Sequence, residues 1–439
     1  MRFAGRPPVP AAVRVVDVRE PVTGLDDVAG YELVRVVVTW GGRPIGTVDV
    51  PNRRRAVTAD DLRETIVRRS GWALLQAMLS EQWAALATAA PALPATVAVS
   101  VVVATYDRPE GLARCLALLR AQETRRPVEI VVVDNHPASG LTRPVVEAVP
   151  GAVLVEEPRQ GLAYARNAGF LAARGAIVAC TDDDVTVPPG WLEALVAPFA
   201  EPDVMAVTGN VLPLELETPA QWFYESYGGL GRGFERRSFD DTWFRSFRGA
   251  VPTWNLGATA NAAFRATAFT DPAIGLMDEA LGPGMPSGVG EDTYLFYRVL
   301  QAGFRLVYEP AAFVWHRHRR DMPALRRQMF GYAKGHVAYH LTTWLRDGDR
   351  RGLRRLAFTL PRWHARQLLR WAYAQVEGGV PYPLSLVLLE IAGHIVGPVA
   401  LWRSRRRVRR EGRSAARGVV SEGPPAPAAA AVQAWKSGS

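Results

Sequence analysis

The spacing of hydrophobic residues changes near residue 97 and divides the chain into parts with different patterns. Residues 31–51 contain two β-type runs joined by a pair of glycines, which predicts a hairpin. Residues 58–79 then show helical spacing, starting with the helix-capping residue type Thr58 and early acidic residues. We therefore expect residues 1–95 to form a small α+β accessory domain, because this part contains no catalytic motif.

Between residues 97 and 185, continuous apolar runs alternate with helical patterns. Apolar runs rich in β-branched residues are typical of strands buried on both faces, and their alternation with helices predicts a parallel sheet. We expect an α/β fold in which a Rossmann-like, mostly parallel sheet is covered by helices on both faces. The apolar runs are 97–106, 128–135, 152–157 and 176–185, and the helical patterns between them are 110–122 and 161–175.

Polar residues follow the apolar runs at the points where the expected strands end. In open parallel sheets, ligands bind beyond the carboxyl ends of the strands, so these residues are candidates for one site. No GxGxxG or P-loop motif occurs at these turns, which weakens the case for a dinucleotide-binding enzyme or a kinase. The residues at the strand ends are Thr105, Asp107, Asp134, Asn135, Asp182, Asp183 and Asp184.

The three adjacent aspartates, residues 182–184, predict a metal site. Neighbouring carboxylates repel one another, but they can ionise together when a divalent cation lies among them. Mg²⁺ and Mn²⁺ bind through one or two carboxylates together with substrate phosphates, so we expect a metal–diphosphate site. The alternative is a solvated acidic turn before the Pro-Pro-Gly sequence at residues 188–190.

The segments after residue 190 predict a loop, a helix and a strand near the site. Residues 219–257 are rich in aromatic residues and glycine, which is typical of a functional loop or lid. Its Trp222 and Trp243, together with Trp254, are candidates for stacking on sugar rings, although core packing explains any one of them equally well. The pattern over 288–303 predicts a helix that opens with two acidic residues, and 304–310 predicts a strand.

The C-terminal region contains one long apolar stretch, residues 383–402. Its length would allow a membrane span, but Glu390 and His394 disfavour spanning and Pro398 would interrupt the helix. Eight arginines and one acid follow between positions 401 and 417. We expect an interfacial helix anchored on anionic lipid, with a membrane span and an ordinary packed helix as the alternatives.

Charge and cysteine content limit the possible partners and the compartment. The net charge is +9, but the arginine-rich segment accounts for most of it, so we expect no nucleic-acid partner. Cys115 and Cys180 cannot form a disulfide framework, and the first residues do not resemble a signal peptide. Together with the basic helix, these features predict a cytoplasmic protein bound peripherally to the inner face of the plasma membrane.

Four motifs in order resemble those of family 2 glycosyltransferases of the GT-A fold. They are VSVVVATYDRPEGLARCLALLRAQ, EIVVVDN, RQGLAYARNAGFLAARGAIVACTDDDV and GEDTYLFYRVLQAGFRLVYEP, and the resemblance covers roughly residues 97–340. It implies a metal-dependent, inverting transfer of a sugar from a nucleotide-diphosphate donor, with UDP among the candidate nucleotides. The acceptor would be a hydroxyl group of a cell-surface polysaccharide, a glycolipid or a natural product.

The resemblance also implies roles for individual residues. Asp292 would be the general base, and Glu291 would orient the site; the alternative is that both only stabilise a helix N-terminus. Arg166 would face the base or the diphosphate, unless it is a surface arginine paired with an acid. Asp134 would bind the nucleobase, and Thr105 and Asp107 would line the base and ribose pocket. Asp182 and Asp184 would bind Mn²⁺ or Mg²⁺, and Asp183 would contact ribose or metal. His316, more than His318, would be a third metal ligand, with a structural or phosphate-facing histidine as the alternative.

The sequence leaves two other functions open. A sugar-phosphate nucleotidyltransferase has a related sheet, but it usually has a basic, Gly-rich loop with a lysine after the first strand, and 104–111 has no lysine. A non-catalytic, membrane-associated scaffold is the second alternative. We expect the glycosyltransferase domain to cover residues 97–345, a helical and membrane-associating region to cover 346–410, and a disordered tail to cover 411–439.

Overall fold

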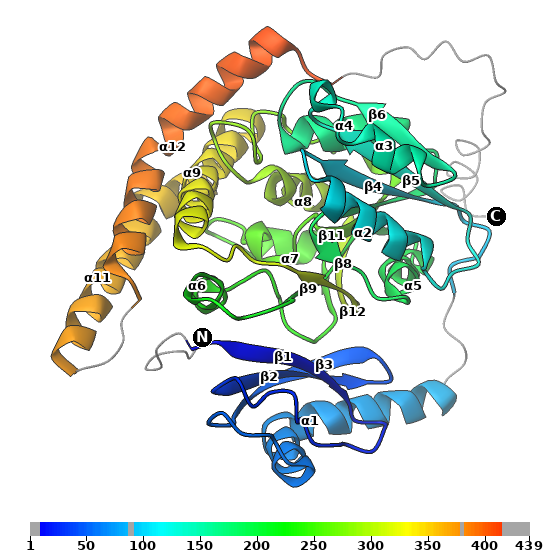
Figure 1. Ribbon diagram of the computed structural model, residues 1–439. Coiled ribbons are helices and arrows are strands. Elements are labelled where there is room, and N and C mark those ends of the chain that lie inside the picture. The colour runs from blue at the N-terminus through cyan, green and yellow to red at the C-terminus, as the bar shows by residue number, and fades with distance from the viewer. Residues whose placement is uncertain (1–8, 87–91, 378–381, 415–439) are drawn as a thin grey trace.

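The computed structural model describes residues 9–86, 92–377 and 382–414, so most of the expected disordered tail lies outside the described residues. The N-terminal part is a three-stranded sheet with one helix on it, and its core is separate from the cores of the large sheet (Figure 1). The predicted hairpin is present, and the two glycines of its turn both have positive φ, as a tight hairpin requires. The elements are β1 (Ala11–Asp17), β2 (Leu33–Trp40), β3 (Arg43–Pro51) and α1 (Ala59–Leu86).

The first strand of this sheet was not expected from the sequence. β1 pairs in parallel with β2, and the amide of Ala11 also donates to the carbonyl oxygen of Leu216 in the large domain. Both partners are distant in sequence, and the local hydrophobic pattern does not reveal them.

The large domain is built on one nine-stranded sheet, and the α/β fold class is confirmed. Its strand order is β10-β12-β9-β11-β7-β4-β5-β6, with β8 paired to β12. The four predicted strands β4–β7 are mutually parallel, whereas β11 runs antiparallel to both β7 and β9. The strands are β4 (Val99–Thr105), β5 (Val128–Asp134), β6 (Ala152–Glu156), β7 (Ile177–Asp182), β8 (Val185–Thr186), β9 (Val204–Pro213), β10 (Arg237–Phe239), β11 (Asn261–Arg265) and β12 (Arg305–His316).

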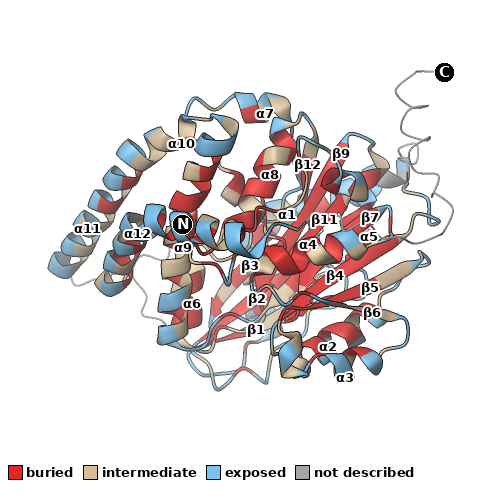
Figure 2. Cartoon of the chain, turned by 90° about the horizontal axis from the view of Figure 1, so that it is seen from above, coloured by how far each residue is buried: buried red, intermediate tan, exposed pale blue. Residues whose placement is uncertain are grey.

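Helices cover both faces of this sheet because its central strands are apolar on both sides (Figure 2). Val102 packs in the core under α4 and α8, whereas its neighbours Val101 and Val103 pack in the core under α2 and α5. Cys180 and Cys115 are buried in these two opposite cores and are both free thiols. The covering helices are α2 (Pro109–Arg120), α3 (Arg143–Glu147), α4 (Leu162–Ala172), α5 (Trp191–Val196) and α8 (Glu291–Gln301).

The aromatic segment expected to be a loop or lid is partly regular. It contains α6 (Pro219–Tyr227), the short strand β10 and α7 (Asp241–Arg245). Thr218 and Gln221 form a reciprocal capping box at the start of α6, which explains why a helix begins there.

The C-terminal helices pack beside the large domain and extend from it (Figure 1). α12 lies against α9, and its glycines allow this close approach: a Cβ on Gly393 would lie 2.6 Å from the Cβ of Ala333. The elements of this region are α9 (Met322–Asp347), α10 (Arg351–Arg354), the π-helical turn η5 (Arg355–Thr359), α11 (Leu360–Glu377) and α12 (Leu384–Glu411).

The face of α12 away from α9 is an exposed apolar stripe. α12 is long and apolar enough to cross a membrane by length and composition alone, and 39% of its most apolar window is buried within the protein. The exposed stripe, which recurs at helical spacing, consists of Leu388, Ile395, Val399 and Trp402.

Candidate active site

The carboxyl ends of β4 and β7 meet at the three aspartates, as the sequence predicted. β4 pairs in parallel with β7, which brings Thr105 beside the aspartates that follow Thr181. The hydroxyl of Thr105 donates to Oδ2 of Asp183 at 2.7 Å, and both residues are buried.

Two arginines from different helices hold the three carboxylates. Arg108, which precedes α2, donates from Nη1 to Asp183 and Asp184, at 3.1 and 2.7 Å. Arg166, from α4, donates to Oδ1 of Asp182 at 2.7 Å and is almost fully buried. The arrangement therefore excludes the alternative that Arg166 is a surface residue, and it adds Arg108, which the sequence analysis did not identify.

Burial and neighbouring charges shift the pKa values of Asp183 and Asp184 in opposite directions. Burial raises the pKa of Asp183 to about 6, although Arg108 opposes this rise. For Asp184, burial is outweighed by His316 and Arg108, so its pKa lies below the usual range. Adjacent carboxylates thus have different proton affinities because they face different partners.

His316 lies beside Asp184 at the end of β12. Its Nε2 is 3.6 Å from Oδ1 of Asp184, and its Nδ1 is 3.0 Å from Nδ1 of His318. Burial lowers the pKa of His316, although the charge of Asp184 opposes this fall, and an imidazole that has lost its proton can bind a metal ion. His318 is turned away from the aspartates, with Nε2 2.9 Å from Oε1 of Glu225.

The side chains beside the aspartates are of types that bind divalent cations, but they need a further ligand to complete a metal site. Two carboxylates and a neutral imidazole are ligands that Mn²⁺ accepts. Within the described residues, however, no three His, Cys, Asp or Glu side chains are close enough together to hold a metal ion by themselves. Phosphate oxygens of a donor would have to complete such a site.

Glu291 and Asp292 form the first turn of α8. Arg166 also reaches this turn, because its Nη1 lies 3.4 Å from Oε1 of Glu291. Burial and the neighbouring charge of Asp292 place the pKa of Glu291 well above its usual range, despite Arg166. Asp292 is less buried, and its Oδ1 accepts from the amide of Thr293 at 2.6 Å.

The loop before α8 is fixed by a close contact with α9. A Cβ on Gly335 would lie 2.1 Å from the carbonyl oxygen of Val289, and a Cβ on Gly288 would lie 2.3 Å from that of Gly331. Since neither contact leaves room for a side chain, glycines at these positions set where the first turn of α8 lies.

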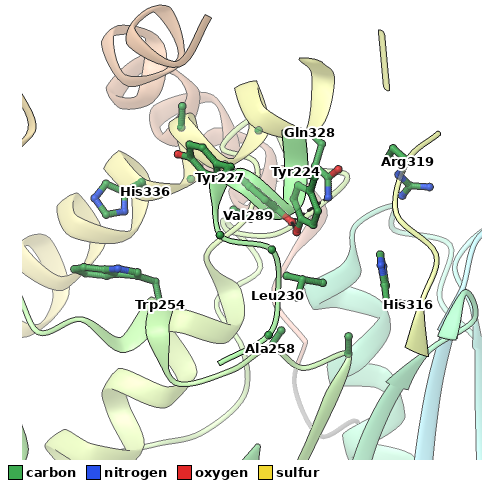
Figure 3. Close-up of a pocket in the computed structure, with 18 of the residues that line it drawn as sticks. Tyr224, Tyr227, Leu230, Trp254, Ala258, Val289, His316, Arg319, Gln328 and His336 are labelled. Atoms are coloured by element: carbon green, nitrogen blue, oxygen red, sulfur yellow. Dashed lines mark hydrogen bonds between the residues drawn. The ribbon is translucent and has the colours of Figure 1, made fainter. Parts of the chain in front are cut away.

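Most of these groups, though not His318 or Glu225, line one cavity of about 3390 Å³ (Figure 3). Asp182, Asp183, Asp184 and His316 lie on one side of it. Glu291 and Asp292 line it as well. Figure 3 shows His316 and Arg319 apart from Trp254 and His336, with Tyr224 and Val289 between them. The cavity thus has the size to hold two substrates at once.

Two predicted nucleotide-binding residues do not line the cavity. Asp134 is buried, and its Oδ1 accepts from the amide of His136 at 2.9 Å. Oδ2 of Asp107 lies 2.7 Å from Nδ1 of His136. Neither aspartate lines the cavity, whereas Tyr106, which stacks on His136 with centroids 5.1 Å apart, does. Tyr106 is the last residue of the first apolar run, directly after β4, and that position was the signal by which it could have been found.

The three tryptophans have different surroundings. Trp222 lines the cavity and lies under the guanidinium of Arg35. Trp243 packs between Phe239 and Phe247 and does not line the cavity. Trp254 lines the cavity as well, so two of the three tryptophans lie at its wall.

Comparisons with known proteins agree with this fold. Residues 100–262 match the family model described as glycosyl transferase family 2. The chain is 30% identical over 237 residues to pre-mycofactocin glycosyltransferase of Mycobacterium tuberculosis, a match that covers 53% of this chain and 45% of that protein. It is 27% identical over 273 residues to glycosyltransferase AglE of Haloferax volcanii, covering 60% of this chain and 79% of the relative.

One solved structure is also similar. It is the mannosyltransferase PcManGT from Pyrobaculum calidifontis in complex with GDP-Man and Mn²⁺, at 20% identity and a TM-score of 0.43, with 83% of this chain and 87% of that chain covered. The chain spans less than half the length of the mycobacterial relative. The sheet, the order of the motifs and the family match agree over residues 100–262, the stretch in which the chain is similar to glycosyl transferase family 2.

Proposed function

We propose that the chain is an inverting glycosyltransferase that moves a sugar from a nucleotide-diphosphate donor to a hydroxyl group of an acceptor. One observation supports this most strongly: the guanidinium of Arg166 contacts both Asp182 and Glu291. This contact brings the three aspartates and the first turn of α8 to opposite sides of one arginine, within a single cavity. A donor diphosphate and an acceptor hydroxyl would then meet between them.

Asp292 is the general base in this proposal. Its carboxylate removes the proton of the acceptor hydroxyl while the oxygen attacks the anomeric carbon of the sugar. The bond from that carbon to the diphosphate oxygen breaks, and its electron pair leaves with the diphosphate. Attack from the side opposite the leaving group inverts the anomeric configuration, so no covalent enzyme intermediate is needed.

Residues on the strand-end side hold the donor. Asp182, Asp184 and His316 would hold Mn²⁺ or Mg²⁺ together with donor phosphates, and Thr105 and Arg108 fix the carboxylates between them. A bound divalent cation would stabilise the negative charge that develops on the leaving diphosphate. Asp134 and Asp107 support the nucleotide site indirectly in this proposal, because they orient His136 against the ring of Tyr106.

The C-terminal helices suit attachment to an anionic membrane surface from the cytoplasmic side. The exposed stripe of α12 is apolar, and exposed arginines follow it at its C-terminal end. Since the opposite face of α12 packs on α9, an orientation parallel to the membrane agrees with the fold better than a span.

A panel of nucleotide sugars, tested with Mn²⁺ and simple glycoside acceptors, tests the proposal. We expect release of a nucleoside diphosphate and a glycoside whose anomeric configuration, measured by NMR, is opposite to that of the donor. Retained configuration would contradict the inverting mechanism. Pyrophosphate exchange with sugar phosphates would instead indicate the nucleotidyltransferase alternative, and absence of any turnover would favour a scaffold.

A further inference from the structure

The cavity continues past the first turn of α8 into a pocket that the proposed chemistry does not use. Side chains from five different segments line this pocket, which we call the distal pocket (Figure 3). Figure 3 shows Trp254 and His336 side by side there, on the far side of Val289 from His316. The lining residues of the distal pocket are Trp254, His336, Arg355, Trp363, Glu390 and His394.

Arg355 is a cation in the distal pocket without an acidic partner. Its Nε donates to Nε2 of His336 at 2.8 Å, and its guanidinium lies 4.4 Å from the ring centroid of Trp254. In the part of the chain that the structure describes, no carboxylate lies within 4.0 Å of it. A half-buried guanidinium that contacts only neutral groups attracts an anion, because most of its charge is left uncompensated.

The histidines around Arg355 do not balance its positive charge, because burial favours their neutral form. Burial is the main reason why the pKa of His336 lies well below its usual value. Burial also lowers the pKa of His340 and of His394 to about 3. Because Nε2 of His336 accepts a hydrogen bond, its proton sits on Nδ1. Neutral imidazoles can therefore supply N–H donors to a ligand.

A buried polar atom without a partner also lines the distal pocket, and two more lie on residues packed behind its wall. Among the described residues, Oε2 of Glu390, Nε2 of His340 and Nδ1 of His364 are buried and make no hydrogen bond. Glu390 is 4% exposed and lines the cavity, so its unsatisfied oxygen is available to a bound molecule. Buried polar groups are normally satisfied, so the orphaned oxygen of Glu390 at the cavity wall agrees with a ligand that completes it.

The backbone at Arg355 is also unusual. This residue begins the π-helical turn η5 between α10 and α11. Such turns are rare and occur frequently at functional sites, because the extra residue changes the direction of a side chain.

The distal pocket lies on the acceptor's side of the proposed reaction. The loop that places Asp292 rests on Gly331 and Gly335 of α9, and His336 is the next residue of that helix. A group bound to Arg355 therefore lies beyond the general base as seen from the three aspartates.

We propose that the distal pocket is an oxyanion subsite in which Arg355 binds a phosphate or carboxylate group of the acceptor, with N–H donors from the neighbouring histidines. This inference rests on the proposed function, because it takes the second substrate to be an acceptor. Leu369 and Tyr373 of α11 line the same cavity and are exposed, so an apolar chain attached to the anion has a surface to follow.

The test uses binding rather than transfer. Full-length protein in EDTA is titrated with inorganic phosphate and, separately, with monomeric decyl phosphate, and thermal stabilisation gives the affinity. Arg355→Gln is compared with Arg362→Gln, a neighbouring exposed arginine that does not line the cavity. We expect Arg355→Gln to weaken phosphate binding at least about 10-fold and Arg362→Gln to leave it unchanged, as loss of a charge-assisted hydrogen bond predicts.

The two probes distinguish the source of the anion. Tighter binding of decyl phosphate than of inorganic phosphate indicates a lipid-linked acceptor, whereas equal binding indicates a soluble anionic acceptor; both results require Arg355. Equal affinity in wild type and Arg355→Gln, or no stabilisation of the wild type by either probe, overturns the inference. Arg355→Lys, which keeps the charge, and donor binding in Mn²⁺ show whether each variant is folded, so failure of the subsite is separable from failure of the proposed transferase activity.

Discussion

Arg35 of the N-terminal sheet and Glu225 of α6 in the large domain form an ion pair, with Nη1 and Oε2 3.4 Å apart. The other oxygen of Glu225 lies against His318, and His318 contacts His316, which faces Asp184. A continuous line of polar contacts therefore leads from the N-terminal sheet to the three aspartates. The N-terminal part is thus in a position to hold one wall of the site in place.

The first prediction concerns this pair. Arg35→Gln should lower the free energy of unfolding by about 3 kcal/mol, because it removes a buried cation and leaves its two partly buried acidic partners unpaired. Arg14→Gln is the control: Arg14 pairs with the exposed Asp27, and its loss should cost less than about 1 kcal/mol. Urea unfolding of both variants measures the difference, and equal losses would contradict the structural role of Arg35.

The second prediction concerns the metal. Asp184→Ala should weaken binding of the donor nucleotide in Mn²⁺ at least 10-fold but change it little in EDTA, because it removes a metal ligand and leaves the nucleotide pocket intact. Asp203→Ala, a change at an exposed aspartate on the opposite edge of the fold, should alter neither value. If the wild type binds the donor with equal affinity with and without metal, the assignment of the metal site is wrong.

The third prediction separates catalysis from helix capping at Asp292. Asp292→Asn keeps the shape and a hydrogen-bonding group but cannot accept the proton, so the transfer rate should fall by about 10²–10⁴-fold with donor affinity unchanged. Asp321→Asn is the matched control, because Asp321 caps α9 by accepting from the amide of Ala324. That change should affect stability alone, by about 1 kcal/mol or less. Near-normal transfer by Asp292→Asn would exclude its role as the base.

The fourth prediction concerns pH. Burial raises the pKa of Glu390 from about 4.5 to about 7, although the hydroxyl of Tyr227 opposes this rise. Between these two pH values the folded protein holds a proton that the unfolded chain releases, so stability falls as pH rises through this window. The loss is at most about 3 kcal/mol.

Glu390→Gln provides the measurement for this effect, because glutamine is neutral at every pH. Between pH 4.5 and 7, wild type should lose stability relative to the variant, as judged from urea midpoints at both ends. A stability gap that is independent of pH would show that Glu390 ionises normally.

The fifth prediction concerns the membrane. Exposed arginines near the end of α12 should each contribute about 1 kcal/mol to binding of anionic vesicles at low salt. Replacing Arg403, Arg406, Arg409 and Arg410 by Gln should release the protein in a vesicle sedimentation assay. The same number of changes among exposed arginines of the N-terminal sheet, at positions 43, 53, 54 and 55, should not. Binding that is insensitive to both sets would contradict a surface anchor.

The sequence predicted the part of the site that depends on local pattern. Buried parallel strands have continuous apolar runs, so the ends of β4, β5 and β7 could be located, and with them Thr105 and the three aspartates. The direction of a side chain at such an end could not be derived. Asp134 satisfies the amide of His136 instead of lining the cavity, because the turn after β5 folds back on it.

Contacts between distant segments were the main omission. Arg355 and His336 come from different helices, and nothing in their local sequence indicates that they meet. Arg166 was predicted to face the base or the diphosphate, but its contact with Glu291, 125 residues away in sequence, depends on the packing of α4 against the start of α8. Such pairs follow from the assembled tertiary structure and not from periodicity.

The residues matched by the family model end at β11, before the first turn of α8 and before α9. On the proposed assignment, the donor half of the reaction therefore lies in one contiguous stretch of chain and the acceptor half in another. Two proteins could share the first stretch, and with it a donor, and still modify unrelated molecules. A chimaera that exchanges residues 286–400 between two relatives would then change what is glycosylated without changing which sugar is transferred.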